Sequence, residues 1–200
     1  SQGFKQVTRE ILLYQDPDTG EVVDRWENPW TGKTVEVIHV TNDPVNQEYR
    51  AEGRGGRKFI LPFSIQGEQW WLTSAVPLFY TNPLAGEYQQ YVGGTYHATE
   101  MFNFFGDVDA LNNKRIDSVP ARVGWVRISG WLPWMEMGDR TGLLYFHTAG
   151  RKLDSYDDLS ETMRDWIAKN TPEYASPPPL DDERRNETSW TFFKKVLDAR

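Results

Sequence analysis

The sequence predicts a mainly β fold: an antiparallel up-and-down, lipocalin-like barrel of about eight strands, followed by C-terminal helices. Three observations lead to this prediction. Short apolar or alternating runs recur between turn motifs along residues 1–150. Aromatic residues make up 14% of the chain, and their large rings can wall a pocket inside a curved sheet. Helix-capping signals cluster after residue 151. The alternative is an open β-sandwich.

The first third of the chain predicts β-hairpins. Residues 4–14 are rich in Val, Ile, Leu and Tyr, and extended patterns resume at residues 21–26 and 34–41. Asp-Pro-Asp-Thr-Gly at 16–20 and Asn-Pro-Trp-Thr-Gly at 28–32 separate these runs. In both motifs Pro fixes φ and Gly supplies the positive φ that a tight turn needs.

The middle of the chain predicts five more strands. Residues 42–56 form a long polar connection that we expect to act as a lid, and the Gly-rich run 53–57 lacks the spacing of a phosphate-binding loop. A helical turn is expected at 107–112. Pro77 implies an edge or bulge position within its strand. The expected strands are residues 58–65, 69–80, 96–105, 120–129 and 142–149.

Residues 151–200 predict a helical extension that packs on the barrel of residues 1–150, so that the whole chain is one domain. Asp157 or Asp158 is expected to cap a first helix that ends before Thr171-Pro172. After a Pro-rich spacer, Thr188 or Ser189 is expected to cap a last helix. That helix carries Trp190, Phe193 and Leu197.

Composition excludes several classes of function. The chain has 29 acidic and 22 basic residues and a net charge of -7, which argues against nucleic-acid binding because that needs a dense Lys/Arg surface. The chain has no Cys, so disulfide scaffolds, thiolate nucleophiles and Cys-ligated metals are excluded. We expect no organic cofactor, and we assign no residue to a metal ion.

The chain contains no segment that predicts a membrane span. Its longest strictly apolar stretch, residues 75–80, is far shorter than a bilayer requires, and the N-terminus lacks a signal-peptide core. These features favour a soluble, cytoplasmic protein, with export after removal of a leader as the alternative. Because the chain begins with Ser, we expect that upstream sequence has been removed.

Several sequence blocks resemble a known family. They are residues 16–22, 28–32, 35–46 and 186–190, together with Trp-Leu-Pro-Trp-Met-Glu-Met-Gly-Asp-Arg at 131–140. On these blocks the chain is similar to the bacterial and fungal proteins grouped as domain of unknown function 1838, over nearly its whole length. Members of that family usually extend further at the N-terminus, which implies that this chain is a truncated or processed form. The resemblance implies no activity and no catalytic residue.

Three histidines lie on three different predicted strands, and a barrel would bring them together. They are His39, His97 and His147. Their spacing does not match a close metal-ligand pair, so separate hydrogen-bonded histidines, acid/base catalysis and a three-His metal site all remain open.

Two acidic residues interrupt apolar runs. Glu100 shares a face with Tyr96, Phe102 and other apolar residues, and Glu136 lies within the Trp-rich run 131–137. A carboxylate in such surroundings has its pKa raised by burial or pairs with an arginine. The nearby arginines are Arg122, Arg127 and Arg140, and a structural Arg–Glu pair is the alternative to catalysis.

The remaining candidates are aromatic or amide side chains on the strands. Tyr145 lies on the same face as His147 and can polarise a carbonyl oxygen, although a core ring is the simpler interpretation. Tryptophans can line a pocket for a flat apolar ligand or simply pack in the core. The substrate-binding candidates are Arg127, Asn103, Trp71, Trp125 and Trp134, and the catalytic candidates are His39, His97, His147, Glu100, Glu136 and Tyr145.

These features favour a cofactor-independent lyase or isomerase that acts on a hydrophobic or aromatic secondary metabolite in a barrel pocket. The alternative from a different class is a lipocalin-like protein that binds a similar ligand without changing it. A third hypothesis is a partner-binding module with a solid interior. The sequence does not decide whether the chain forms a homo-oligomer.

Overall fold

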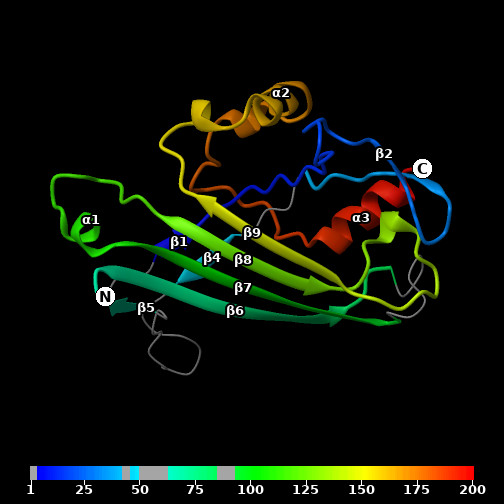
Figure 1. Cartoon of the computed structure of the whole chain (residues 1–200), viewed down its shortest axis with the longest axis horizontal. Coiled ribbons are helices and arrows are strands. Elements are labelled where there is room, and N and C mark those ends of the chain that lie inside the picture. The colour runs from blue at the N-terminus through cyan, green and yellow to red at the C-terminus, as the bar shows by residue number, and fades with distance from the viewer. Residues whose placement is uncertain (1–3, 42–45, 50–62, 85–92) are drawn as a thin grey trace.

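The computed structural model describes residues 4–41, 46–49, 63–84 and 93–200. Its largest element is an antiparallel sheet of five strands, each hydrogen-bonded to the next along the chain. These strands are β5 (Phe63–Gln66), β6 (Gln69–Thr81), β7 (Thr95–Asp107), β8 (Arg122–Ser129) and β9 (Leu144–Arg151). Figure 1 shows them as one twisted sheet, which confirms the predicted mainly antiparallel β architecture.

Strand β6 contains a proline because part of the strand has only one neighbour. Pro77 pairs with Thr99 of β7, whereas β5 pairs only with residues 69–72 of β6. Within the described residues, the missing N–H of Pro77 therefore faces no neighbouring strand, as the edge position predicted for it requires.

The alternation of side chains gives this sheet two different faces. One face carries Tyr96, Ala98 and Glu100 of β7, and Tyr96 and Ala98 are buried. We call it the inner face. The opposite face carries Phe79 and Tyr145, whose rings are each 65% exposed. We call it the outer face.

A covering layer lies over the inner face. It contains two small ladders, β1 (Phe4–Gln6) with β4 (Gln47–Tyr49) and β2 (Arg25–Glu27) with β3 (Thr34–Glu36). The positive φ of Gly20 and Gly32 confirms the two turns predicted around β2. Figure 1 shows the helices α2 and α3 on this same side of the sheet.

The prediction of a closed eight-strand barrel is not met among the described residues. The N-terminal strands form separate two-stranded ladders and do not pair with the edges of the five-stranded sheet. Between β1 and β2, the only strand-like pairings described are the isolated bridges Leu12 to Val40 and Gln15 to Val22. Side chains of this segment pack against the sheet instead, so the interior is enclosed by face-to-face packing and not by a continuous ladder.

Two helices of residues 151–200 complete the covering layer. Helix α2 (Glu161–Asn170) is capped by Ser160, whose side chain accepts a hydrogen bond from Met163 N. The predicted caps Asp157 and Asp158 lie instead in the short 3-10 helix η2 (Tyr156–Asp158), where Asp158 completes a capping box. Helix α3 (Ser189–Asp198) is capped by Thr188, as predicted.

The shorter helices turn the chain between these elements. They are α1 (Val108–Asn112), η1 (Pro133–Met135) and η3 (Pro172–Ala175). The predicted helical turn at 107–112 is thereby confirmed. No helix in the described ranges is long and apolar enough to cross a bilayer.

The hydrophobic core joins the covering layer to one end of the sheet. Val35, Val37, Trp134 and Phe193 are buried in one cluster against Leu144 and Phe146 of β9. Trp190 of α3 is fully buried on Tyr96, with ring centroids 4.5 Å apart. The buried amide of Asn28 ties the second turn to η1, since its Nδ2 donates to Met135 O and its Oδ1 accepts from Trp30 N.

Most of the predicted lid lies outside the described residues. This applies to residues 42–45 and 50–56, to the whole Gly-rich run 53–57, and to the first part of the strand expected at 58–65. Residues 46–49 are described and contain β4.

The packing of Trp190 predicts a large effect on stability. Trp190→Ala should lower the free energy of unfolding by about 3–5 kcal/mol, because it leaves a cavity under α3. Trp30→Ala is the matched control, since Trp30 is 46% exposed and should cost about 1 kcal/mol. Urea denaturation followed by circular dichroism measures both, and equal losses would contradict the packing of α3 on β7.

Candidate functional site

A buried ion pair lies at the centre of the inner face. Arg127 of β8 stands directly opposite Glu100 of β7 in the strand register, and its Nη1 donates to Glu100 Oε1. Its Nη2 donates to the Tyr96 hydroxyl at 2.7 Å. The side chains of Arg127 and Glu100 are 13% and 17% exposed. The arginine predicted to pair with Glu100 is thus Arg127, while Arg122 and Arg140 are exposed elsewhere.

The guanidinium of Arg127 keeps its charge in this position. Burial alone would lower the pKa of Arg127, but the Tyr96 hydroxyl and the Glu100 carboxylate outweigh burial and raise the pKa above its ordinary value. Arg127 is therefore a permanent cation below the covering layer.

Two ionisable groups of the covering layer lie close to this pair. Burial raises the pKa of Glu10 above its ordinary value of 4.5, and the negative charge of Glu100 adds to this effect while Arg127 opposes it. Glu10 is itself an exposed residue by its accessible surface, so protein atoms crowd its carboxyl while solvent still reaches the side chain. A carboxyl with a raised pKa can both release and accept a proton nearer to neutral pH.

Tyr14 supplies a hydroxyl that interacts electrostatically with Glu10. Burial is the main cause that raises the pKa of Tyr14, so this hydroxyl stays protonated and can donate a hydrogen bond. Arg127 and the indole of Trp134 oppose the shift, and the ring of Trp134 meets Tyr14 edge-on at 5.2 Å. We call Glu10, Tyr14, Tyr96, Glu100 and Arg127 the Glu10–Arg127 cluster.

His39 holds the backbone of this segment. Its Nδ1 accepts a hydrogen bond of 3.1 Å from Tyr14 N, and its ring stacks on Tyr14 with centroids 5.9 Å apart. Since Nδ1 is an acceptor, the ring proton lies on Nε2, which is buried without a hydrogen-bond partner in the described part of the chain. Burial lowers the pKa of His39, against the smaller effect of Asp24. The neutral ring thus positions Tyr14.

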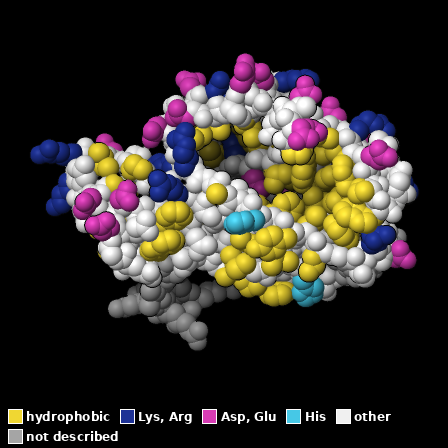
Figure 2. All heavy atoms as spheres, viewed as in Figure 1, with side chains coloured by type: hydrophobic (Ala, Val, Ile, Leu, Met, Phe, Trp, Pro, Cys, Tyr) yellow, Lys and Arg dark blue, Asp and Glu magenta, His cyan; other side chains and the backbone are white. Residues whose placement is uncertain are grey.

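Aromatic rings surround the cluster on the inner face. Trp125 lies between Phe102 and Phe146, with centroids 6.4 and 6.1 Å away. All three are half-buried, and their neighbours Val76 and Phe104 are still more exposed. Figure 2 shows the molecule hollowed between the sheet and the covering layer, with hydrophobic walls and charged side chains inside. The covering layer thus leaves part of the aromatic inner face open.

This arrangement suits proton transfer near a developing negative charge. Glu10 can move a proton, whereas Tyr14 and Arg127 can donate hydrogen bonds to an oxygen that becomes negative. The rings offer an apolar surface on which the rest of a small molecule can lie.

Five of the predicted site residues lie on the outer face, away from the cluster. They are His97, His147, Tyr145, Asn103 and Trp71. The ring of His97 meets Phe79 edge-on at 5.3 Å, and Trp71 stacks on Phe105 at 4.9 Å. The sheet therefore separates His97 and His147 from His39, and the expected convergence of the three histidines is not found. The cause is the alternation of side chains along a strand. His97 and Asn103 are an odd number of positions from Glu100 on β7, and His147 pairs with Val126, the neighbour of Arg127, so all three side chains point to the opposite face.

Two further candidates belong to the turn after β8. Trp134 of η1 is buried in the core, where it contacts Tyr14 and Trp26. Glu136 follows η1 in the left-handed region with φ 50°, which turns its side chain to the surface and an ion pair with Lys33 at 3.4 Å. Glu136 therefore does not share the interior with Glu100.

Sequence reasoning missed Glu10, Tyr14 and the role of Tyr96. Glu10 directly precedes the apolar run Ile-Leu-Leu-Tyr at 11–14, so it carries the same signal that singled out Glu100. The described residues contain no group of three His, Cys, Asp or Glu side chains placed to hold a metal ion.

The chain belongs to the family described as Protein of unknown function (DUF1838), whose model matches residues 1–197. No curated protein and no solved structure matches the chain.

The buried ion pair predicts a strong dependence of stability on both partners. Arg127→Leu should cost about 3 kcal/mol at pH 7, because it leaves Glu100 buried without a cation. Adding Glu100→Leu should recover much of that loss. The exposed pair Lys33 and Glu136 is the control. Lys33→Leu, alone or combined with Glu136→Leu, should cost less than about 1 kcal/mol. Urea denaturation of these variants tests this, and a double variant no more stable than Arg127→Leu alone would contradict it.

The raised pKa of Glu10 predicts a stability effect that depends on pH. A carboxyl whose folded pKa is raised contributes stability that is present below 4.5 and is lost as the pH rises through the folded value. Glu10→Gln should therefore raise the free energy of unfolding at pH 8 and have little effect at pH 4. The exposed Glu21, changed to Gln, should show no such trend in the same urea titrations. An equal effect of Glu10→Gln at both pH values would contradict the raised pKa.

Proposed function

We propose that this protein catalyses proton transfer on a small apolar or aromatic molecule that carries a carbonyl group, in an isomerisation, a dehydration or a decarboxylation. The observation that carries this proposal is the Glu10 carboxyl with its raised pKa, which interacts electrostatically with the Tyr14 hydroxyl and the Arg127 guanidinium over an aromatic face. Such a carboxyl is the usual tool of general acid–base catalysis at neutral pH.

In the proposed reaction, ionised Glu10 takes the proton from the carbon next to the carbonyl. The electron pair of that C–H bond moves into the carbonyl, whose oxygen becomes an enolate oxygen. The Tyr14 hydroxyl and an N–H of Arg127 donate hydrogen bonds to this oxygen. When the substrate has a β,γ double bond, protonated Glu10 then returns the proton to the γ carbon and the double bond moves into conjugation, which completes an isomerisation. When it has a β-hydroxyl, protonated Glu10 gives the proton to that group, which leaves as water while the enolate electrons form the Cα–Cβ double bond. In a decarboxylation, loss of CO2 from a β-keto acid forms the enolate and Glu10 protonates it.

The substrate body is proposed to lie on Phe102, Trp125 and Phe146. These rings are half-buried and border the ion pair, so an apolar substrate would exclude water from the reacting atoms. In this proposal the substrate lies between the sheet and its covering layer, and not inside the lipocalin-like barrel that the sequence predicted. His39 is a positioning residue, since it acts through the backbone of Tyr14.

One observation favours a binding protein as the second candidate. Arg127 already donates to both Glu100 and Tyr96, so its charge is largely satisfied without a ligand. A protein that only holds a hydrophobic molecule on the aromatic inner face needs no free catalytic group, and the paired Arg127 fits that role as well.

Deuterium exchange tests the two candidates. The probe is 2-tetralone, an aromatic ketone with acidic protons next to its carbonyl, incubated with the protein in D2O and followed by proton NMR. We expect the protein to accelerate exchange at these positions, and Glu10→Gln to reduce the acceleration by at least about 10²-fold.

The matched control is Glu21→Gln, which changes the same charge at an exposed site and should exchange like the unaltered chain. Binding of 2-tetralone without faster exchange supports the binding protein. Equal acceleration by the unaltered chain and by Glu10→Gln excludes Glu10 as the proton-transfer group.

A further inference from the structure

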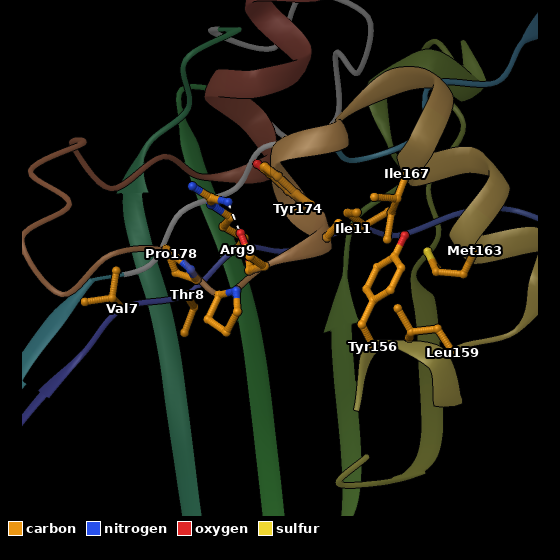
Figure 3. Close-up of a pocket in the computed structure, with 13 residues that line it drawn as sticks. Val7, Thr8, Arg9, Ile11, Tyr156, Leu159, Met163, Ile167, Tyr174 and Pro178 are labelled. Atoms are coloured by element: carbon orange, nitrogen blue, oxygen red, sulfur yellow. Dashed lines mark hydrogen bonds between the residues drawn. The ribbon is translucent and has the colours of Figure 1, made fainter. Parts of the chain in front are cut away.

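We call residues 7–15, which follow β1, the N-terminal segment. A pocket of about 530 Å³ lies between this segment and the helices of residues 151–200. Its volume falls in the range of about 300–1,000 Å³ that is usual for small-molecule sites. Figure 3 shows its walls: Val7, Thr8 and Arg9 from the N-terminal segment at one end, and side chains of η2 and α2 at the other.

The α2 end of the pocket is apolar. Met163 and Ile167 are four residues apart on one face of α2, and Tyr156 of η2 and Leu159, which follows η2, lie beside them in Figure 3. Ile11 of the N-terminal segment completes this end. The lining here has no charged side chain, so it suits a hydrocarbon chain.

The opposite end carries one fixed cation. Arg9 Nη1 donates to Glu173 O at 2.5 Å, and the guanidinium lies 4.9 Å from the centre of the Tyr174 ring. These contacts hold Arg9 in one place. Arg9 is the only charged residue among the described residues that line the pocket, so a ligand anion would meet its positive charge there.

The charges around Arg9 leave this end positive. Arg9 interacts electrostatically with the Asp182 carboxylate, which is already bound by Arg184 through Nε and Nη2. Arg184 and Arg9 together lower the pKa of Asp182 to about 2, so Asp182 stays ionised. Of these three groups only Arg9 lines the pocket, so the charge on the pocket wall is positive.

This pocket is separate from the Glu10–Arg127 cluster. Val7, Thr8, Arg9 and Ile11 line the pocket, whereas Glu10 and Tyr14 interact electrostatically with Arg127 on the sheet side. Glu10 and Tyr14 are not among the residues that line the pocket.

We propose that this pocket binds an aliphatic carboxylate of medium length, with the hydrocarbon chain between Ile11, Met163 and Ile167 and the carboxylate at Arg9. The charge and the apolar lining select this class of ligand over a neutral alcohol, which brings no negative charge, and over a short acid, which brings no hydrocarbon.

Methionine NMR tests the location. The chain contains four methionines, and Met163 alone of them lines the pocket, while Met135 and Met137 are core residues and Met101 lies on the outer face. Sodium octanoate below its critical micelle concentration should shift the ¹³Cε resonance of Met163 saturably and leave the other three in place. Met163→Leu assigns the resonance by removing it.

Two variants with the same added bulk provide the control for location. Ala175→Trp adds a ring at the wall of the pocket and should abolish the shift of Met163. Ala168→Trp places the same ring on an exposed position of α2 outside the lining and should preserve it.

The head group is tested by comparing octanoate with octan-1-ol. Octanoate should bind the unaltered chain at least tenfold more tightly, and Arg9→Gln should remove this preference. The comparison on the unaltered chain stands even where Arg9→Gln does not fold.

Three results would overturn the proposal: no saturable shift of Met163, a shift at Met101 instead, or equal affinity for octanoate and octan-1-ol. Glu10→Gln should leave octanoate binding unchanged. A failure of proton transfer at Glu10 and a failure of this pocket are thus separate outcomes.

Discussion

The charge of Arg127 is the constraint on which the interior depends. A guanidinium that is mostly removed from water requires a carboxylate and further acceptors, and Glu100 and Tyr96 supply them from the neighbouring strand. This fixes the register of β7 on β8, because a slip of one residue would send Glu100 to the outer face. It also sets the field in which Glu10 and Tyr14 lie, since both interact electrostatically with Arg127. The same ion pair therefore stabilises the fold and defines the candidate site.

The N-terminal segment is a wall of two different sites. Its backbone is held by the Leu12 bridge to Val40 and by His39, and it contributes side chains both to the pocket next to α2 and to the Glu10–Arg127 cluster. Arg9 and Glu10 are consecutive, so the two sites share one short stretch of chain.

The sequence predicted the strands of the sheet better than the way in which they are covered. Alternation and turn residues are local signals, and they located β6 to β9 and the cap at Thr188. The pairing of Glu100 with an arginine was also predictable, because a carboxylate inside an apolar strand needs a partner. The covered face was not predictable, since both faces of β7 carry aromatic residues and only distant packing by Trp190 buries one of them.

Other parts of the site depend on contacts between distant residues. Glu10 and Glu100 are 90 positions apart, so no spacing along the chain reveals that they meet. Glu136 looked equivalent to Glu100 because it interrupts an apolar run. The left-handed backbone after η1, which turns Glu136 outward, is rare for a residue other than Gly and leaves no clear pattern in the sequence. His97 and His147 were placed on strands correctly, but their parity sends them to the outer face.

Local charge distinguishes the ligands that the two sites accept. The Glu10–Arg127 cluster contains two carboxylates and one guanidinium, so its net charge is -1 when Glu10 is ionised and zero when Glu10 is protonated. Neither state attracts an anion. The negative charge of Glu100, which adds to the raised pKa of Glu10, would also repel a substrate carboxylate. Among the reactions proposed for this cluster, isomerisation or dehydration of a neutral ketone is therefore favoured over decarboxylation of a β-keto acid. The pocket at Arg9 carries a positive charge, so an anionic ligand is favoured in that pocket and not at the Glu10–Arg127 cluster.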